Sequence, residues 1–308
     1  MKMQNIVNGP QNVSAIVQGC MRMPALTKQK AAEVISTAYD CGVNFFDHAT
    51  CYGAGEAEVR FCEAFALTGL KREDIYIQSK CGICPERSEF DWTKENILES
   101  VDGILKRLGT DYLDTLLLHR PDLLFDPEEV AEAFDTLEKA GKVRWFGVSN
   151  LVPMQCDLLK KYCSQPLVIN QVQLSLEQSQ LIDQALYMNN KTTELSINRD
   201  GNVLDYCRLN DITVQAWSPL QKGMFGGSFI DDPEFPELNK ALDEIAQREG
   251  VSKAAVAIAW ILRHPAKIQT IIGTMSPEHI RDACAASDVK LSHNDWYRLY
   301  LASGKFLP

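Results

Sequence analysis

Four side chains of complementary chemistry occur in the first half of the chain: an acid, a phenol, an amine and an imidazole. They are Asp47, Tyr52, Lys80 and His119, and each lies at or just beyond the end of a short apolar stretch. A tyrosine titrates near about 10 in water, so it acts as an acid at neutral pH when a cation stabilises its phenolate. Lys80 can supply that charge, Asp47 can hold the ammonium, and His119 can hydrogen-bond a reacting oxygen. Together the four suit protonation of a carbonyl oxygen while a hydride arrives at carbon.

Each of these residues also has an ordinary structural explanation. Asp47 alone can cap the turn after its strand, and Tyr52 alone can be a surface residue. A lone Lys80 or His119 is most often a solvated or hydrogen-bonded polar group. Their joint occurrence at successive strand ends favours a site.

The elements that must position these residues are short buried strands alternating with longer amphipathic helices. Strands are predicted at residues 14–19, 43–46, 75–80, 113–118, 144–148, 168–173, 212–216 and 268–272. Helices are predicted at 28–41, 55–68, 94–108, 127–140, 153–163, 178–188, 201–210, 236–249, 252–263 and 277–286. Such alternation implies right-handed βαβ crossovers and a parallel sheet. Eight units in a chain of this length favour an α/β fold of the (β/α)8 TIM barrel type over a doubly wound sheet.

Two terminal segments fall outside the eight units. Residues 2–13 can form an N-terminal β-hairpin lid with Asn8 and Gly9 in its turn, and residues 292–303 predict an extra C-terminal helix. No composition shift or low-complexity stretch divides the chain, so a single domain over residues 1–308 is expected. In barrels of this kind the chemistry lies at the C-terminal ends of the strands, where the four residues are predicted to be.

Composition and charge limit the possible partners. The chain has 308 residues, of which 45% are hydrophobic and 23% charged, with a net charge of −10. An acidic protein does not suit a nucleic-acid surface, although it can hold one phosphate-bearing cofactor in a local pocket. The longest apolar run, 254–262, is far shorter than the ~20 residues of a membrane span, and the N-terminus lacks the apolar core of a signal peptide. We therefore expect a soluble cytoplasmic protein whose ten cysteines are thiols.

Seven stretches, in order and in context, are similar to motifs of the aldo-keto reductase superfamily. They are NFFDHATCYG, IQSKCG, LLLHRPD, GKVRWFGVSN, INQVQ, AWSPL and IIGTMSPEHIR. The resemblance covers nearly the whole chain. The residues of these motifs are most similar to those of a bacterial branch of predicted oxidoreductases. It implies an NADPH-dependent carbonyl reductase that transfers hydride from the nicotinamide C4, with Tyr52 as the proton donor. Lys80 is then expected to lower the pKa of Tyr52, Asp47 to orient Lys80, and His119 to position the carbonyl oxygen.

The resemblance also implies which residues hold the cofactor. Ser149, Asn150 and Gln171 match the residues that bind the nicotinamide carboxamide, and Trp217 matches the residue that stacks on the ring. The other expected cofactor contacts are Asp47 and the turns after the first, seventh and eighth strands: Gly19, Cys20, Met21, Ser218, Leu220, Gly223, Gly273, Thr274, Ser276 and Arg281.

The adenosine end decides between the two nicotinamide cofactors. Arg281 can grip a 2′-phosphate in a bidentate manner, which favours NADP(H). Two departures weaken the match: Met275 replaces a lysine common in the family, and Cys284 with Ala285 replaces a common Glu-Asn pair. NADP(H) is therefore the preferred cofactor and NAD(H) stays open. No metal is expected, because the proton donor and its charged neighbours polarise the carbonyl.

Two other functions are compatible with a barrel of this kind. One is a cofactor-binding sensor or regulatory subunit with little turnover, which the intact set of four residues disfavours. The other is a metal-dependent barrel hydrolase, which the lack of paired histidine and carboxylate ligands at the strand ends disfavours. Cys81 and Cys84 form a lone C-x-x-C, which is poor evidence for zinc, and Cys51 beside Tyr52 can make the site sensitive to oxidation.

The substrate is a small carbonyl or alcohol compound whose identity depends on residues 82–92, 221–235 and 304–308. The aromatic residues of these segments predict a partly apolar pocket: Phe90, Trp92, Phe225, Phe229 and Phe306. Arg120 to Asp122 are expected to form a structural turn with an internal ion pair. The resemblance suggests a monomer.

Overall fold

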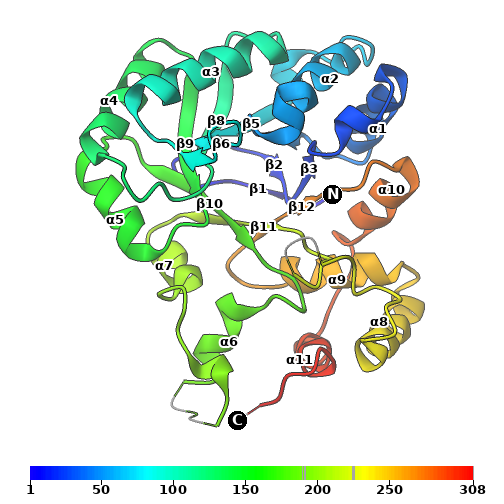
Figure 1. Cartoon of the computed structure of the whole chain (residues 1–308). Helices are drawn as coiled ribbons and strands as arrows, with labels where there is room; N and C mark the ends of the chain where they lie inside the picture. Colours follow the sequence, from blue (N-terminus) through cyan, green and yellow to red (C-terminus); the bar gives the residue numbers. More distant parts are fainter. Residues whose placement is uncertain (189, 191, 224–225, 308) are drawn as a thin grey trace.

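The computed structural model describes residues 1–188, 190, 192–223 and 226–307, and its centre is a closed barrel of eight parallel strands (Figure 1). The barrel strands are β3 (Ile16–Gly19), β4 (Phe45–Asp47), β5 (Tyr76–Cys81), β8 (Leu113–Leu118), β9 (Val143–Ser149), β10 (Leu167–Gln173), β11 (Thr213–Trp217) and β12 (Gln269–Ile272). Strands adjacent in this order pair with each other, and β12 pairs with β3 to close the barrel. The predicted (β/α)8 barrel is confirmed.

Helices surround the barrel, and every predicted helix is present with ends that differ by a few residues (Figure 1). They are α1 (Lys28–Asp40), α2 (Glu56–Phe65), α3 (Lys94–Leu108), α4 (Pro127–Lys139), α5 (Pro153–Tyr162), α6 (Gln180–Leu186), α7 (Val203–Leu209), α8 (Pro236–Glu249), α9 (Lys253–Leu262), α10 (Pro277–Ala285) and α11 (His293–Ala302). Side chains cap several of them; for example, Thr27 and Thr93 accept backbone N–H groups at the starts of α1 and α3. The helix α11 is the extra C-terminal helix.

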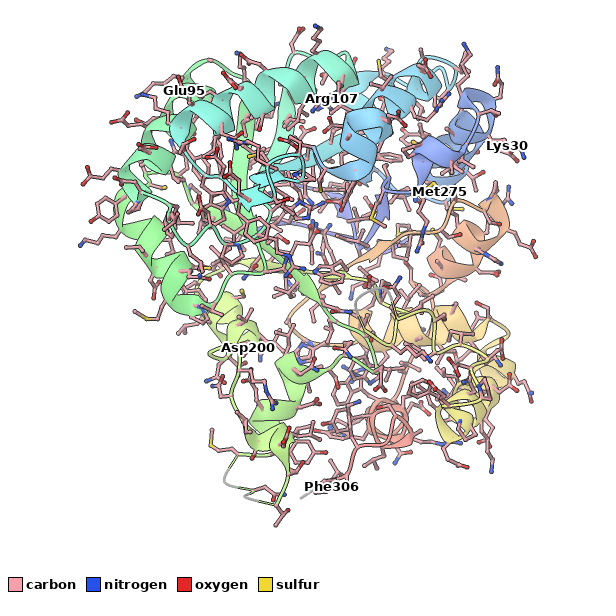
Figure 2. The ribbon with its side chains drawn as sticks, viewed as in Figure 1. Lys30, Glu95, Arg107, Asp200, Met275 and Phe306 are labelled. Carbon is pink, nitrogen blue, oxygen red and sulfur yellow. The ribbon has the colours of Figure 1, made fainter. Side chains whose placement is uncertain are left out.

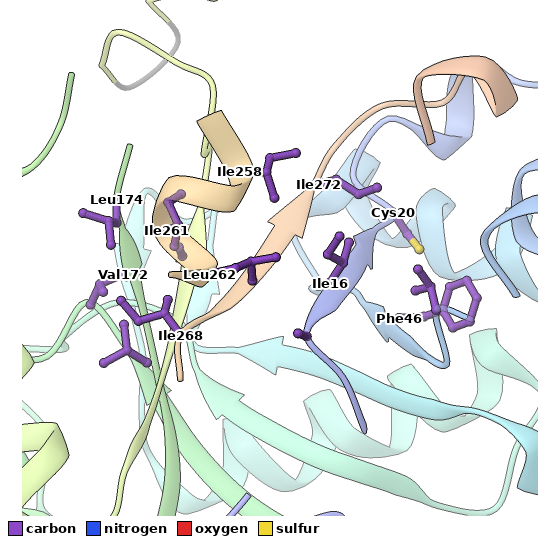
Figure 3. Close-up of a cluster of buried hydrophobic side chains, with 14 of the residues drawn as sticks. Ile16, Cys20, Phe46, Val172, Leu174, Ile258, Ile261, Leu262, Ile268 and Ile272 are labelled. Carbon is purple, nitrogen blue, oxygen red and sulfur yellow. The ribbon is translucent and has the colours of Figure 1, made fainter. Parts of the chain in front are cut away.

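The main core lies between the barrel and its helices (Figure 3). Ile16 of β3 and Ile272 of β12 lie on this outer side of the barrel, where Ile258 and Ile261 of α9 also contribute to the core. A smaller apolar cluster fills the barrel interior and includes Val17, the next residue of β3. Successive side chains of a strand point to opposite faces, so one strand such as β3 supplies residues to both cores.

The N-terminal hairpin closes the end of the barrel opposite to the strand ends that carry the predicted site. Its strands β1 (Met3–Gln4) and β2 (Val13–Ser14) pair antiparallel. Ser14 N donates to the side chain of Asn44, just before β4, and Tyr76 OH at the start of β5 donates to Gln11 O. Ile6, in the loop between β1 and β2, packs into the interior cluster. The predicted hairpin is therefore present, and it forms the floor of the barrel, because the first residues of the strands hold it.

Candidate active site

Asp47, Lys80 and Tyr52 form one hydrogen-bonded group at the C-terminal ends of β4 and β5. Lys80 Nζ donates to Asp47 Oδ2 at 2.8 Å, to the carbonyl oxygen of His48 at 2.8 Å and to Tyr52 OH at 3.1 Å. The side chains of Lys80 and Asp47 are 0% and 3% exposed. These three acceptors use all three hydrogens of the ammonium. Because the Tyr52 oxygen accepts from Lys80, its own hydrogen is left for another acceptor.

His119 completes the group from the end of β8. Its ring lies edge-on to that of Tyr52, with the ring centres 6.1 Å apart and the planes at 83°. Its backbone N–H donates to the carbonyl oxygen of Cys81 at 2.9 Å, which fixes the turn after β8. Cys51 Sγ lies 3.7 Å from His119 Nδ1. The structure thus brings the four predicted catalytic side chains together around one point.

Burial and the Lys80 charge set the protonation of the group. Burial raises the pKa of Tyr52 to about 12, although Lys80 acts to lower it. Burial also lowers the pKa of Lys80, but Asp47 and Tyr52 outweigh it and the net pKa lies above the usual range. Burial and the nearby Lys80 and Arg120 hold the pKa of His119 well below its usual value. At neutral pH Tyr52 is therefore protonated, Lys80 charged and His119 neutral.

The turn that carries Tyr52 depends on glycine and on a buried ion pair. Gly53 (φ 59°) and Gly55 (φ 90°) adopt left-handed conformations between β4 and α2, which favour glycine. The following helix is anchored by Glu58, which is buried and accepts from Ser79 Oγ at 2.7 Å and from Arg107 Nε at 2.7 Å. Arg107 reaches it from α3 (Figure 2). These contacts fix the start of α2, and with it Tyr52, against the strand that carries Lys80.

The predicted nicotinamide residues form a hydrogen-bonded series that leads to Asp47. Trp217 Nε1 donates to Asn150 Oδ1 at 3.2 Å, and Asn150 Nδ2 donates to Ser149 Oγ at 2.7 Å. Ser149 Oγ donates to the backbone oxygen of Gln171, whose Nε2 donates to Asp47 Oδ1 at 3.0 Å. Since Gln171 uses its amide nitrogen on Asp47, its Oε1 is the group left to accept from a carboxamide. The half-buried Trp217 offers a ring face, so these residues fit a nicotinamide.

The predicted contacts for the rest of the cofactor lie on adjoining strand ends. Gly19 pairs with Asp47, Cys20 is buried, and Met21 is exposed. After β11, Ser218, Leu220 and Gly223 follow Trp217; Ser218 (φ 53°) and Gly223 (φ 132°) bend the loop. After β12, Gly273, Thr274, Met275 and Ser276 lead into α10 (Figure 2), where Ser276 Oγ accepts from His279 N and Arg281 is exposed.

Two arginines beside the site were overlooked in the sequence. Arg22 directly follows the Gly19 turn, and its Nη1 donates to the carbonyl oxygen of Gly273 at 3.1 Å. Arg120, predicted as part of a structural turn, lies 5.9 Å from the centre of the Trp217 ring. Each directly follows a residue predicted for the site, Arg22 after Met21 and Arg120 after His119, which was the available signal. Asp122, its predicted ion-pair partner, accepts the backbone N–H groups of Leu124 within the turn and of Trp92 in the loop after β5.

The aromatic residues expected at the pocket differ in their placement. Trp92 and Phe229 are fully buried in the core, so they are wrong as pocket residues. Trp92 packs on Phe125 with the ring centres 5.1 Å apart. Phe90 is exposed, and Phe306 contacts Tyr187 in the C-terminal tail. Phe225 lies outside the described residues.

The cysteines are not joined in pairs. All ten cysteines are free thiols, and Cys84 Sγ accepts from Arg87 Nη2. Within the described residues, no group of three or more His, Cys, Asp and Glu side chains is arranged to hold a metal ion. No helix in the described part of the chain combines the length and apolarity needed to cross a membrane.

The closed parallel barrel thus carries a buried lysine, a tyrosine and a histidine together at the ends of neighbouring strands. The Aldo/keto reductase family model matches residues 15–300, and the chain belongs to this family. It is accordingly an NAD(P)H-dependent oxidoreductase acting on carbonyl and alcohol groups.

Individual relatives match over nearly their full length. The chain is 36% identical to the uncharacterized oxidoreductase YcsN of Bacillus subtilis, with 94% of each chain covered. It is 35% identical to a 6-dehydroglucose reductase of Agrobacterium fabrum, with 95% of each covered. Among solved structures, the thermostable aldo-keto reductase Tm1743 superposes with a TM-score of 0.79 at 26% identity, covering 98% of this chain and 100% of that one.

Proposed function

We propose that the protein is an NADPH-dependent carbonyl reductase that interconverts aldehydes or ketones with alcohols, and that Tyr52 is its proton donor. The observation that carries the proposal is the 3.1 Å bond from the buried Lys80 ammonium to Tyr52 OH. We further propose that residues 1–308 act as one domain and as a cytoplasmic monomer, in line with the sequence.

The chain's own groups supply the acid and the electrostatics of the reaction. A bound reduced nicotinamide supplies the hydride. Tyr52 gives its proton to the carbonyl oxygen, and Lys80 stabilises the phenolate that remains. Asp47 compensates the buried charge of Lys80 and keeps it within reach of Tyr52. His119, which is neutral, donates a hydrogen bond to the carbonyl oxygen and orients it.

The same proposal assigns the cofactor contacts. Ser149, Asn150 and Gln171 hold the carboxamide and Trp217 stacks on the ring. The groups expected at the ribose, pyrophosphate and adenosine phosphate are Gly19, Cys20, Met21, Ser218, Leu220, Gly223, Gly273, Thr274, Ser276 and Arg281. Arg22 adds a cation beside Gly273, which supports a phosphate at this position.

Replacing Arg281 by alanine tests the NADP(H) preference. Loss of a charge-assisted bond to a 2′-phosphate is expected to weaken NADPH binding by about 10- to 100-fold and to change NADH binding by less than about two-fold. Fluorescence titration with both nucleotides measures this. The control is Arg298→Ala, an exposed arginine on α11 that pairs with Glu244. Equal weakening of both nucleotides in the Arg281 variant contradicts the assignment.

The protonation states predict how reduction depends on pH. The pKa of Tyr52 is about 12, so Tyr52 stays protonated below that value. His119 stays neutral above its lowered pKa. The value of kcat/KM for carbonyl reduction is therefore expected to be level between about pH 6 and 9. Steady-state rates across this range check it. A fall in activity centred near the ordinary histidine value shows instead that His119 titrates in the working enzyme.

Turnover with NADPH and a panel of aldehydes and ketones tests the function itself. The relative named 6-dehydroglucose reductase makes an oxidised sugar a reasoned member of the panel. Oxidation of NADPH that depends on both the protein and a carbonyl compound supports the proposal. Nucleotide binding with no turnover across the panel supports a sensor with little activity.

A further inference from the structure

Two glutamine amides hold the Asp47 carboxylate from the side opposite Lys80. Gln78 Nε2 donates to Asp47 Oδ1 at 2.7 Å and to Gln215 Oε1 at 2.9 Å. Gln171 Nε2 makes the matching pair, at 3.0 Å to Asp47 Oδ1 and 3.1 Å to Gln215 Oε1. Asp47 Oδ1 therefore accepts two amide hydrogens, while Oδ2 accepts from Lys80.

The amides continue as a chain toward the floor of the barrel. Gln215 Nε2 donates to Gln269 Oε1 at 2.9 Å, and Gln269 Nε2 donates to the backbone oxygen of Ser14 at 2.8 Å. The carboxylate of Asp47 and the carbonyl of Ser14 can only accept hydrogen bonds. Each amide must then present its nitrogen or its oxygen as the structure shows, because reversing one breaks the bonds of its neighbours.

The chain crosses the barrel interior and excludes water from its bonds. Strands β4 and β10 are not neighbours in the barrel, and neither are β5 and β11, so the bonds from Gln171 to Asp47 and from Gln78 to Gln215 span it. Gln78 and Gln215 are both 0% exposed. Buried hydrogen bonds of this kind are stronger than exposed ones and depend on one another.

Gln78 donates to Asp47 but leaves its own side-chain oxygen without a hydrogen bond within the described part of the chain. Its Oε1 is buried and accepts no hydrogen bond from any residue that the structure describes. An unpaired buried acceptor lowers stability. The amide nitrogen of Gln78 donates to both Asp47 Oδ1 and Gln215 Oε1, so the orientation of the side chain is explained by what these two acceptors require.

The charge of Asp47 matters to Tyr52 because the two act on each other through space. The negative charge of Asp47 raises the pKa of Tyr52, whereas Lys80 lowers it. Amide donors on Oδ1 offset part of the carboxylate charge and prevent its rotation. Asp47 can then anchor Lys80 without cancelling the ammonium's effect on the phenol.

We propose that Gln78 and Gln215, with Gln269 behind them, are positioning residues whose amide chain fixes Asp47 against Lys80 and keeps the ammonium directed at Tyr52. This inference rests on the proposed function, because it concerns the same proton donor. Gln171 belongs both to this chain and to the proposed carboxamide site, so the chain also joins the cofactor site to Asp47.

Gln78→Met and Gln215→Met test the positioning role. In Gln78→Met, kcat for reduction is expected to fall about 10-fold, with KM and NADPH affinity within about two-fold of wild type. Alcohol oxidation at pH 9, which requires the ionised form of Tyr52, is expected to fall by about 10-fold relative to wild type, because loss of an amide donor leaves more charge on Asp47. Gln215→Met is expected to lower it in the same direction by less, because both donors to Asp47 remain.

Thr115→Val is the matched control. Thr115 pairs with Gln78 in the barrel, is fully buried, and its Oγ1 has no partner among the described residues. This variant is expected to keep the wild-type rate and pH profile. If the glutamine variants share the profile of Thr115→Val, the glutamines are packing residues and the positioning role is wrong.

Two further measurements distinguish failure of the amide chain from failure of the proposed function. Exchange of the Gln78 and Gln171 side-chain amide protons with solvent, followed by NMR in the wild-type protein, is expected to be slow. Rapid exchange overturns the amide chain without any variant having to fold. A wild-type protein that reduces no carbonyl compound contradicts the proposed function instead, and the positioning role falls with it.

Discussion

Tyr52→Phe is expected to lower kcat for carbonyl reduction by about 10²- to 10⁴-fold, the usual contribution of a general acid. Only the hydroxyl is lost, so the ring that lies edge-on to His119 is retained. The hydroxyl donates no bond that the cofactor contacts require. NADPH affinity is therefore expected to stay within about two-fold of wild type, which fluorescence titration beside steady-state kinetics measures.

The matched control for this loss is Tyr76→Phe. Tyr76 lies at the start of β5, and its hydroxyl donates to the backbone oxygen of Gln11 at the floor of the barrel. Removing it is expected to leave kcat unchanged and to lower stability by ~0.5–1.5 kcal/mol. Near-normal turnover in Tyr52→Phe means that another group donates the proton.

Lys80→Met is expected to reduce both activity and stability. The phenol loses the cation that stabilises its ionised form, so kcat is expected to fall by about 10²- to 10³-fold. Asp47 is left buried without its counter-charge, which costs ~3–5 kcal/mol of the free energy of unfolding. Urea denaturation and kinetics on the same preparation measure the two effects.

The double variant Asp47→Asn with Lys80→Met separates these two effects. It removes the unpaired charge, so most of the lost stability is expected to return, while kcat stays low because the cation is still absent. Recovery of activity together with stability shows that Lys80 serves the fold and not the reaction.

The barrel and its four strand-end residues could be predicted because both signals are local. Each strand is a short apolar run followed by helical residues, and parallel barrels gather their chemistry at one end of the strands. Asp47, Lys80 and His119 follow three such runs in succession. The pairing of those strands in the barrel, β4 with β5 and β5 with β8, brings them together.

The amide chain and the placement of the hairpin could not be predicted in the same way. Gln78 precedes Lys80 by two residues and Gln215 precedes Trp217 by two, so alternation places both pairs on the same face. The bonds between them, however, depend on the stagger of strands that are not neighbours. The position of the hairpin also depends on contacts between residues far apart in the chain, such as the bond from Ser14 N to the Asn44 side chain.

The net shift in the pKa of Tyr52 could not be predicted from the sequence either. Lys80 does lower the pKa of Tyr52, as expected, but burial raises it by more. The extent of burial is a property of the packed site and not of any motif. The consequence is a phenol that stays protonated at neutral pH but gives up its proton less readily than a free tyrosine, so it depends on Lys80 to stabilise the phenolate.

Deuterated NADPH tests most directly whether hydride passes from nicotinamide C4 to the carbonyl carbon with Tyr52 as the proton donor. The protein is incubated with NADPH carrying deuterium on either face of nicotinamide C4 and with an aldehyde that it reduces, and the alcohol is examined by mass spectrometry. We expect deuterium on the carbinol carbon from one face only, and almost none with Tyr52→Phe although that variant still binds NADPH. Unlabelled alcohol from both forms of the cofactor contradicts hydride transfer, and equal labelling by the wild type and Tyr52→Phe contradicts the role of Tyr52.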